Sequence, residues 1–312
     1  MYKKPLLRVI FVIVLFLWLA GCSRAPEAAP IFAGHLHGLW VRNDSHIWVV
    51  GDEGVILHSS DGGQTWRPQV SGTSNALELI YGTGPDLWTV GVRGTILHSR
   101  DDGTTWTRQA SGSAYGLESL YGTGSHLYAV GRGGTILCSE DGGQHWQRRK
   151  SGTENELFSV YGSGPQLWAV GVEGTILHSA DWGQNWQPQR SGIIDTLRCT
   201  YSDGAQVWAA GTGGVILHSP DGGQHWLPQN SGTTSTLTSF YGSGNNLWTV
   251  GVDGTILHSP DQGAHWELQD SGTNRHLLEV RGAGEHVWAV GYGAIVLHST
   301  DGGENWQRQP VG

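Results

Sequence analysis

The sequence predicts an all-β fold, a seven-bladed β-propeller with four antiparallel strands in each blade. Three observations lead to this prediction. One unit of 40 residues recurs seven times between residue 31 and the end of the chain, with no insertion evident between units. Each unit holds four short stretches rich in β-branched or aromatic residues, bounded by Gly, Ser, Asp or Pro. The chain is also rich in Gly (49) and Trp (16), which suits short strands joined by tight turns with indoles packed between them.

The second unit illustrates the four expected strands, which we name A to D in chain order. They span Leu77–Tyr81, Leu87–Val92, Thr95–Ser99 and Thr105–Gln109. Four strands in each unit of this length are typical of a propeller blade. We expect strand A nearest the axis and strand D at the outer edge, where Pro and charged side chains hinder pairing with a foreign strand.

The connection between strands C and D carries the most regular motif, Ser-x-Asp-x-Gly-x-x-Trp. A short carboxylate can accept hydrogen bonds from its own turn, and the glycine tolerates a positive φ. We therefore interpret the aspartates as structural and not as metal or catalytic residues. They are Asp61, Asp101, Asp141, Asp181, Asp221, Asp261 and Asp301.

A histidine precedes the motif serine in six units, and Cys138 takes its place in the third. Sevenfold symmetry would separate neighbouring histidines by roughly 15 Å, too far to share one metal ion. We expect packed strand residues and predict neither a metal nor a cofactor. The aromatic residues of strand B are expected in the core, and Cys138 and Cys199 are expected to be buried and unpaired. The histidines are His58, His98, His178, His218, His258 and His298, and the aromatic residues are Trp48, Trp88, Tyr128, Trp168, Trp208, Trp248 and Trp288.

The first 21 residues have the anatomy of a secretory signal, with basic residues followed by an uncharged apolar run over residues 9–20. The run ends in Leu-Ala-Gly-Cys22, which resembles a bacterial lipobox and implies cleavage before Cys22 and lipid attached to it. We expect residues 22–33 to be a lipid-anchored tether and residues 34–312 the propeller. The alternative is an ordinary signal peptide or anchor helix. Ser23 favours the outer over the inner membrane of a bacterial cell envelope.

The repeated motif resembles the Asp-box of BNR-type repeats, and the resemblance covers residues 31–312. With seven units and the N-terminal anchor, the chain is similar to the photosystem II stability/assembly factor family. That resemblance implies a chaperone-like binding role without enzymatic activity.

Function is expected where the units differ. Alternating connections place the D–A and B–C loops on one face of the disc, here the D–A face, and the A–B and C–D loops on the other, the A–B face. The D–A face is the more variable, although drift at exposed loop tips would also explain this. Glu78, Glu118 and Arg198 differ from the residues at the same inner-strand position of other units, near the channel mouth. The candidate binding residues are Arg93, Arg132, Glu173, Asp253, Tyr115, Tyr292, Arg198 and Arg275.

Two irregularities lie elsewhere. Trp182 replaces the first glycine of the fourth Asp-box and is a candidate contact residue on the A–B face. The residue ending strand A is a tyrosine in five units, but we assign Val41 to this position in the first unit and Arg281 in the seventh. Because the units run from A to D and stop, we predict no strand exchange at closure, with the seam of blades 7 and 1 held by side-chain packing alone.

The expected partner is a protein, with a glycan as the alternative, and we expect a monomer that contacts the membrane through its lipid. A net charge of −9 without a basic stripe argues against nucleic acid. A sialidase-like glycosidase would need clustered arginines, a Tyr nucleophile and an acid/base carboxylate. The arginines are scattered over different units, and the Arg-Ile-Pro motif is absent. The seven units also differ from the six blades expected of a sialidase.

Overall fold

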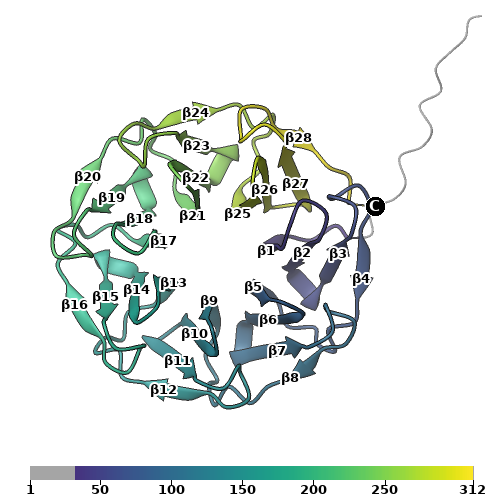
Figure 1. The fold of residues 1–312 in the computed structure, drawn as a ribbon, viewed down its shortest axis with the longest axis horizontal. Helices are drawn as coiled ribbons and strands as arrows, with labels where there is room; N and C mark the ends of the chain where they lie inside the picture. Colours follow the sequence, from purple (N-terminus) through teal and green to yellow (C-terminus); the bar gives the residue numbers. More distant parts are fainter. Residues whose placement is uncertain (1–31, 312) are drawn as a thin grey trace, which may run out of the picture.

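A computed structural model describes residues 32–311. The predicted signal peptide, Cys22 and most of the predicted tether lie outside the described residues. Seven four-stranded antiparallel sheets surround a central channel (Figure 1), which confirms the predicted propeller. Every sheet contains four strands consecutive in sequence, so no strand is exchanged between the chain ends.

Each blade runs from strand A at the axis to strand D at the rim. The A strands are β1 (Leu36–Val41), β5 (Leu77–Thr83), β9 (Leu117–Thr123), β13 (Leu157–Ser163), β17 (Leu197–Ser202), β21 (Leu237–Ser243) and β25 (Leu277–Ala283). The B strands are β2 (Ile47–Gly51), β6 (Asp86–Gly91), β10 (His126–Gly131), β14 (Gln166–Gly171), β18 (Val207–Gly211), β22 (Asn246–Gly251) and β26 (His286–Gly291).

The outer strands are shorter. The C strands are β3 (Ile56–Ser59), β7 (Thr95–Ser99), β11 (Thr135–Ser139), β15 (Ile176–Ser179), β19 (Ile216–Ser219), β23 (Ile256–Ser259) and β27 (Ile295–Ser299). The D strands are β4 (Arg67–Gln69), β8 (Thr107–Arg108), β12 (Gln147–Arg149), β16 (Gln187–Gln189), β20 (Leu227–Gln229), β24 (Glu267–Gln269) and β28 (Gln307–Arg308). Short 3-10 turns in five B–C loops are η1 (Asp52–Gly54), η2 (Val92–Gly94), η3 (Val172–Gly174), η4 (Thr212–Gly214) and η5 (Val252–Gly254).

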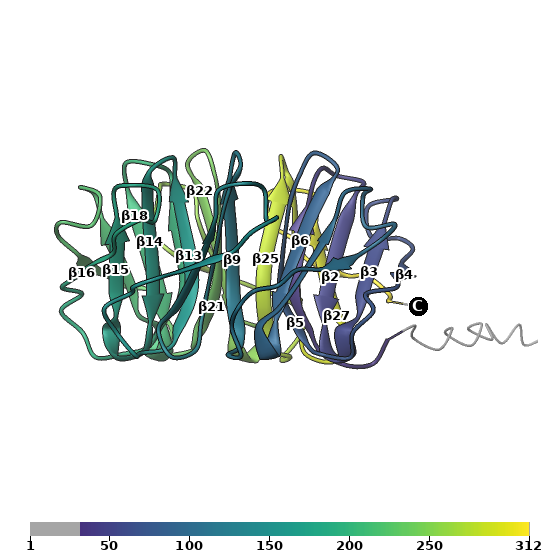
Figure 2. The same cartoon turned by 90° about the horizontal axis from the view of Figure 1, so that it is seen from below.

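The loops divide between the two faces of the disc as predicted (Figure 2). In blade 1 the Asp52 N–H donates to the His35 carbonyl at 3.0 Å, which joins the B–C turn to the start of strand A. The Gly62 N–H donates to the Ser45 carbonyl at 3.0 Å, which joins the C–D loop to the A–B loop. In the second blade the predicted strand C coincides with β7, whereas strand D is shorter than predicted because its ladder with β7 begins only after Trp106.

The first blade departs from the strict repeat. Trp40 pairs with Trp48 across β1 and β2, as Tyr81 pairs with Trp88 in blade 2. Trp40 therefore holds the tyrosine position, and the assignment of Val41 to it is wrong. The expectation of no insertion is also wrong. Residues 42–46 separate the paired Val41 and Ile47 in blade 1, one residue more than the four that separate the equivalent pair Gly82 and Leu87 in blade 2.

The Asp-box aspartates cap their own turns, the geometry expected of a structural residue. Asp61 Oδ1 accepts from the Ser59 hydroxyl and the Thr65 N–H, both at 2.8 Å, and Asp61 Oδ2 accepts from the Thr65 hydroxyl at 2.6 Å. These hydrogen bonds, above all those from Thr65, lower the Asp61 pKa to about 2. Gly63 has a φ of 87°, as its position in the motif required. The fourth residue after each aspartate supplies a matching side-chain donor: Thr65, Thr105, His145, Asn185, His225, His265 and Asn305.

Neighbouring blades are joined by the Asp-box tryptophan, which packs in the cluster that contains the strand B aromatic ring of the preceding blade. Trp106 of blade 2 packs in the cluster of Trp48 from blade 1. Trp186 of blade 4, 5% exposed, packs in the cluster of Tyr128 from blade 3. The remaining clusters repeat this arrangement, so each blade interface buries apolar area that neither blade could bury alone.

The seam between blades 7 and 1 uses the same packing, with Trp66 and Trp288 in one cluster. Packing is not its only contact, so that part of the prediction is wrong. The Ala294 N–H donates to the Gly34 carbonyl at 2.8 Å, and the Gly293 N–H donates to His35 Nδ1 at 3.1 Å. Residues that precede the first strand therefore tie the first blade to the last.

Strand C histidines stack on strand B tryptophans, which confirms their interpretation as packed strand residues. The rings of Trp48 and His58 lie 4.3 Å apart at 8°, and those of Trp288 and His298 lie 4.3 Å apart at 5°. In blade 3 both members of this pair are different residues, since Tyr128 replaces the tryptophan and lies opposite Cys138, which replaces the histidine. Burial lowers the pKa of all six histidines, so they are neutral at neutral pH. Both Cys138 and Cys199 are buried and free.

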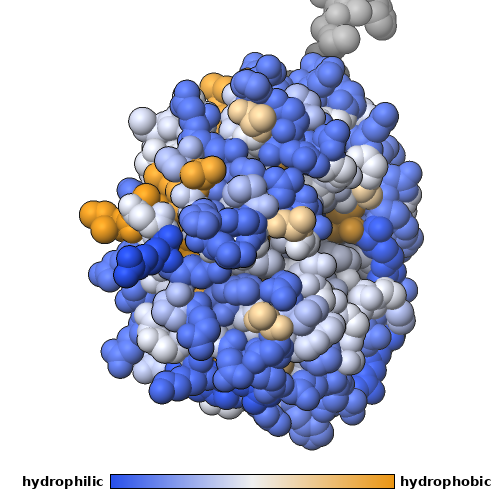
Figure 3. All heavy atoms as spheres, turned by 60° about the vertical axis from the view of Figure 1, so that its left-hand side comes forward, coloured by the Kyte–Doolittle hydropathy of each residue, from blue (hydrophilic) through white to orange (hydrophobic). Residues whose placement is uncertain are grey.

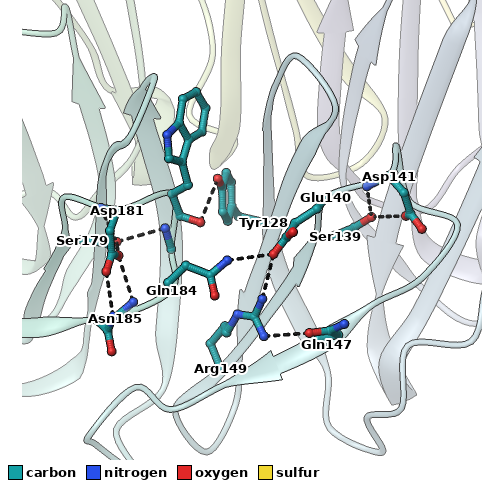
Figure 4. Close-up of polar contacts among 12 residues, drawn as sticks. Tyr128, Ser139, Glu140, Asp141, Gln147, Arg149, Ser179, Asp181, Gln184 and Asn185 are labelled. Carbon is teal, nitrogen blue, oxygen red and sulfur yellow. Dashed lines mark hydrogen bonds and ion pairs between the residues drawn. The ribbon is translucent and has the colours of Figure 1, made fainter.

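Trp182 lies at the junction of blades 3 and 4 on the A–B face. It has a φ of 59° and is 38% exposed, and its indole packs against His126 with ring centroids 4.7 Å apart. Figure 4 shows the same junction, where the Tyr128 hydroxyl donates to the Trp182 carbonyl at 3.2 Å. Glu140 also accepts there from Gln184 at 2.7 Å and from Arg149 at 3.0 Å.

The stacked histidines predict that acid destabilises the fold. Burial and neighbouring positive charge lower the pKa of His58 and His298 from 6.5 to about 4. The unfolded chain then binds more protons between pH 6.5 and 4, so stability present above pH 6.5 is lost as the pH falls through this window. The double variant His58→Gln, His298→Gln should lose less stability than the native chain between pH 7.5 and 5, by about 1–2 kcal/mol per histidine.

Urea unfolding at the two pH values measures this difference. Glu118 and Glu279, whose pKa is raised to about 7 mainly by burial, contribute the opposite slope in both proteins and therefore cancel in the comparison. Equal losses in the two proteins would contradict the assignment.

The left-handed backbone at Trp182 predicts that a glycine substitution is less destabilising than an alanine substitution. A left-handed backbone costs an alanine about 1 kcal/mol and costs glycine almost nothing. Trp182→Ala and Trp182→Gly both remove the indole, so the glycine variant should be more stable by about 1 kcal/mol. Thermal unfolding of the pair tests this, and an alanine variant as stable as the glycine variant would refute it.

Candidate functional site

The A strands enclose a cavity of about 640 Å³ along the channel. Two rings of side chains line it. The mouth tier is formed by the second residue of each A strand and lies towards the D–A face, where these strands begin. It consists of His37, Glu78, Glu118, Phe158, Arg198, Thr238 and Leu278. The aromatic tier is formed by the fifth residue and lies deeper. Its cavity-lining members are Trp40, Tyr81, Tyr121, Tyr161, Tyr241 and Arg281, and Tyr201 holds the equivalent position in blade 5.

The mouth tier is acidic on the side of blades 1 to 3. His37 Nε2 lies 3.0 Å from Asp52 Oδ1, and His37 Nδ1 lies 3.0 Å from Glu78 Oε2. Burial opposes protonation of His37, but hydrogen bonds to these two carboxylates outweigh it and raise the His37 pKa. Arg132 Nε lies 3.1 Å from Glu156 and 3.5 Å from Glu118.

Glu118 is the most perturbed carboxyl group of the mouth. Its side chain is 18% exposed, and burial is the largest cause that raises its pKa to about 7. The negative charges of Glu78 and Glu156 add to the effect, while Arg132 and Arg198 oppose it. Glu118 is therefore poised to change charge near neutral pH, as carboxyl groups in binding clefts often are.

The opposite side of the mouth carries a cation on an aromatic ring. The Arg198 guanidinium carbon lies 4.1 Å from the ring centroid of Phe158. The two residues occupy the same tier position in adjacent blades. This cation–π contact helps to hold the guanidinium at the cavity wall.

The aromatic tier is built by contacts between neighbouring blades. The Tyr81 hydroxyl donates to the Gly122 carbonyl at 2.8 Å, and the Tyr121 hydroxyl donates to the Gly162 carbonyl. A Cβ atom at Gly122 would lie 2.5 Å from the Tyr81 ring, so the glycine makes room for it. In blade 7 the tyrosine is replaced by Arg281, which lies 2.6 Å from Glu279 and donates to the Phe240 carbonyl at 2.9 Å.

The predicted binding residues share the D–A face but do not form one cluster. Arg132, Arg198 and Tyr292 line the central cavity. Arg93 and Asp253 each have a φ of 56° in the B–C turns of blades 2 and 6.

Glu173 lines a second cavity of about 530 Å³, together with Pro188, Arg190 and Ile193. The neighbouring Ile194 is 88% exposed. Figure 3 brings the rim of blades 4 and 5 forward and shows a mostly hydrophilic surface, with hydrophobic residues gathered at its left edge. This cavity is separate from the channel.

Tyr115 is exposed, whereas Arg275 and Tyr292 help to build the seam. Tyr292 stacks on His35 with ring centroids 4.2 Å apart. The Arg275 guanidinium donates to the Gly293 carbonyl at 3.0 Å and thus caps the B–C turn of blade 7. Tyr115, at 53% exposure, and Tyr292, at 40%, are the aromatic rings that this face presents to solvent among residues 32–311.

Sequence reasoning missed Phe158, the Glu279–Arg281 pair and the tyrosines as parts of the channel wall. The available signal was their shared position within strand A, the second or the fifth residue. Glu279 and Arg281 contact each other, but the other contact partners lie about one unit away in the sequence and are brought together by the packing of neighbouring blades.

Within residues 32–311 there is no group of three or more His, Cys, Asp or Glu side chains placed to hold a metal ion. No helix in this part of the chain is long and apolar enough to span a membrane.

Two family models match parts of the chain. Residues 234–312 match a family described as photosynthesis system II assembly factor YCF48, and residues 40–158 match a DUF6242 β-propeller domain. No curated protein sequence gave a match.

Solved structures share the fold at low identity. YCF48 from Cyanidioschyzon merolae is 17% identical with a TM-score of 0.71, over 86% of this chain and 97% of that one. YCF48 bound to D1 peptide is 20% identical with a TM-score of 0.72, over 88% and 96%. The GH74 xyloglucanase from Xanthomonas campestris is 15% identical with a TM-score of 0.71, over 90% of this chain but only 55% of the enzyme.

The family match over the last two blades and the shared fold agree with the resemblance carried by the Asp-boxes, so the chain is a BNR-repeat, seven-bladed β-propeller similar to the photosystem II assembly factors.

Proposed function

We propose that the chain is a binding and scaffold protein, without enzymatic activity, that holds a segment of a protein partner at the channel mouth on its D–A face. We further propose that a lipid on Cys22 anchors it to a bacterial membrane, with the outer membrane favoured by Ser23. The proposed role resembles that of an assembly factor, and the proposed working form is a monomer.

The observation that carries this proposal is the convergence of non-repeated charged residues at one end of the channel. Strand B and the Asp-boxes keep nearly the same residues in all seven blades, whereas the mouth tier changes from blade to blade. Glu78, Glu118 and Arg132 meet there with Arg198 on the far side. Charged and polar groups arranged around a loop-lined concavity are suited to select a partner.

The arrangement suits binding better than glycoside hydrolysis. A sialidase-like site needs several arginines around one substrate carboxylate. Of the three arginines that line the cavity, Arg132 and Arg281 are already paired with carboxylates of the chain. Arg93 and Arg275 lie in loops away from the cavity wall. Protein binding is supported by a solved propeller of this fold, the YCF48 bound to D1 peptide.

Site-specific photo-cross-linking in intact cells tests the proposal with the full-length chain. A benzophenone amino acid at Tyr115 or Tyr292 should capture one discrete protein, whereas the same group at Leu268 on the rim of blade 6, 70% exposed, should not. Arg132→Glu should weaken capture by about tenfold or more, because it removes the cation that pairs with two carboxylates. Arg108→Glu, on the exposed strand D of blade 2, is the matched control.

Equal capture from the rim position, or capture unaffected by Arg132→Glu, would contradict the proposed site. Adducts that contain only glycan would favour the glycan-binding alternative instead.

A further inference from the structure

Arg198 has hydrogen-bonding capacity that the described chain does not use. Its guanidinium rests on Phe158 in the wall of the central cavity and makes no hydrogen bond or ion pair with any of residues 32–311. The other two arginines of this wall are paired, Arg132 with Glu118 and Glu156, and Arg281 with Glu279. The guanidinium carbon lies over the Phe158 ring, and the guanidinium N–H groups have no partner among residues 32–311.

From this geometry we propose that the channel binds a small monocarboxylic acid with an apolar or aromatic body, and that Arg198 binds its carboxylate. The planar guanidinium edge matches a carboxylate with two parallel hydrogen bonds. This goes beyond the proposed partner site, because it assigns a small-molecule ligand to the interior of the channel.

The cavity around Arg198 has the size and lining that such a ligand needs. Its volume of about 640 Å³ lies within the range of small-molecule sites. Phe158 and Tyr161 offer aromatic surface in the same cavity wall as Arg198. The contact with the Phe158 ring restricts the motion of the cation, which lowers the entropy lost when a ligand binds.

The acidic side of the mouth restricts the charge of the ligand. Glu78, Glu118 and Asp52 face the same channel mouth, so a doubly charged anion would meet stronger repulsion than a singly charged one. A carboxylate with one charge satisfies Arg198 without adding a second charge near these acids. The site should therefore discriminate against inorganic phosphate.

Binding of 4-fluorobenzoate to the full-length chain in nanodiscs, followed by ¹⁹F NMR, tests the assignment. We expect a saturable change in the fluorine signal with the native chain. Arg198→Thr should weaken binding by about tenfold or more, since it removes both charge-assisted hydrogen bonds. Thr238 already occupies the equivalent position in blade 6, so the strand accommodates threonine. Arg198→Lys should restore part of the affinity, and Phe158→Leu should weaken binding several-fold.

Arg108→Gln is the matched control, because that arginine is exposed on strand D of blade 2, away from the cavity, and its loss should leave the affinity unchanged. Neutral 4-fluorobenzamide should not bind, and inorganic phosphate should not displace the acid. The inference fails if Arg198→Thr binds as the native chain does, if the amide binds as well as the acid, or if phosphate competes effectively.

Competition with a short peptide distinguishes the two possible sources of the carboxylate, a small acid and the C-terminus of a polypeptide. If N-acetylglycylphenylalanine displaces the probe far better than fluorobenzoate itself, the occupant is a polypeptide terminus and the small-molecule assignment is wrong. Photo-cross-linking from Tyr115 does not depend on Arg198. Loss of probe binding with retained capture would therefore overturn only this inference and leave the proposed function standing.

Discussion

The structure depends on one repeated contact, in which the Asp-box tryptophan of each blade joins the strand B aromatic cluster of the blade before it. A single four-stranded sheet of this length has no core of its own, because both faces remain open until neighbours cover them. Trp66 and Trp288 make the contact across the seam as Trp106 and Trp48 do inside the ring. The ring can therefore close without an exchanged strand. The Asp-box turn positions each tryptophan, and its carboxylate is satisfied locally.

The sequence predicts this framework well because its causes are local and repeated. The serine, aspartate and glycine of each box act within one turn, and the histidine and tryptophan of strands C and B meet in direct cross-strand register. The pattern does not reveal the register of the first blade. Trp40 replaces a tyrosine there, and the longer A–B loop masks the one-residue shift of strand A.

The candidate site is less predictable for a different physical reason. Arg198 and Phe158 are separated by one whole unit and meet only because adjacent A strands pack side by side. The seam hydrogen bonds of Gly34 and His35 come from residues that precede the first strand and have no counterpart in the repeat pattern. Residues at equivalent positions of neighbouring units become neighbours in space only when the blades pack together in the ring.

The same regularity separates structure from function. Aspartates, tryptophans and strand C histidines are accounted for by turns and packing, which leaves the mouth tier as the place where blades differ around one cavity. The most direct test replaces three mouth residues by residues that other blades already carry at those positions, Glu78→Thr, Glu118→Thr and Arg132→Val. Capture by a benzophenone at Tyr115 is then measured beside the thermal unfolding midpoint. We expect an unfolding midpoint within a few degrees of the native value and loss of the captured partner. Undiminished capture by a folded triple variant would contradict it.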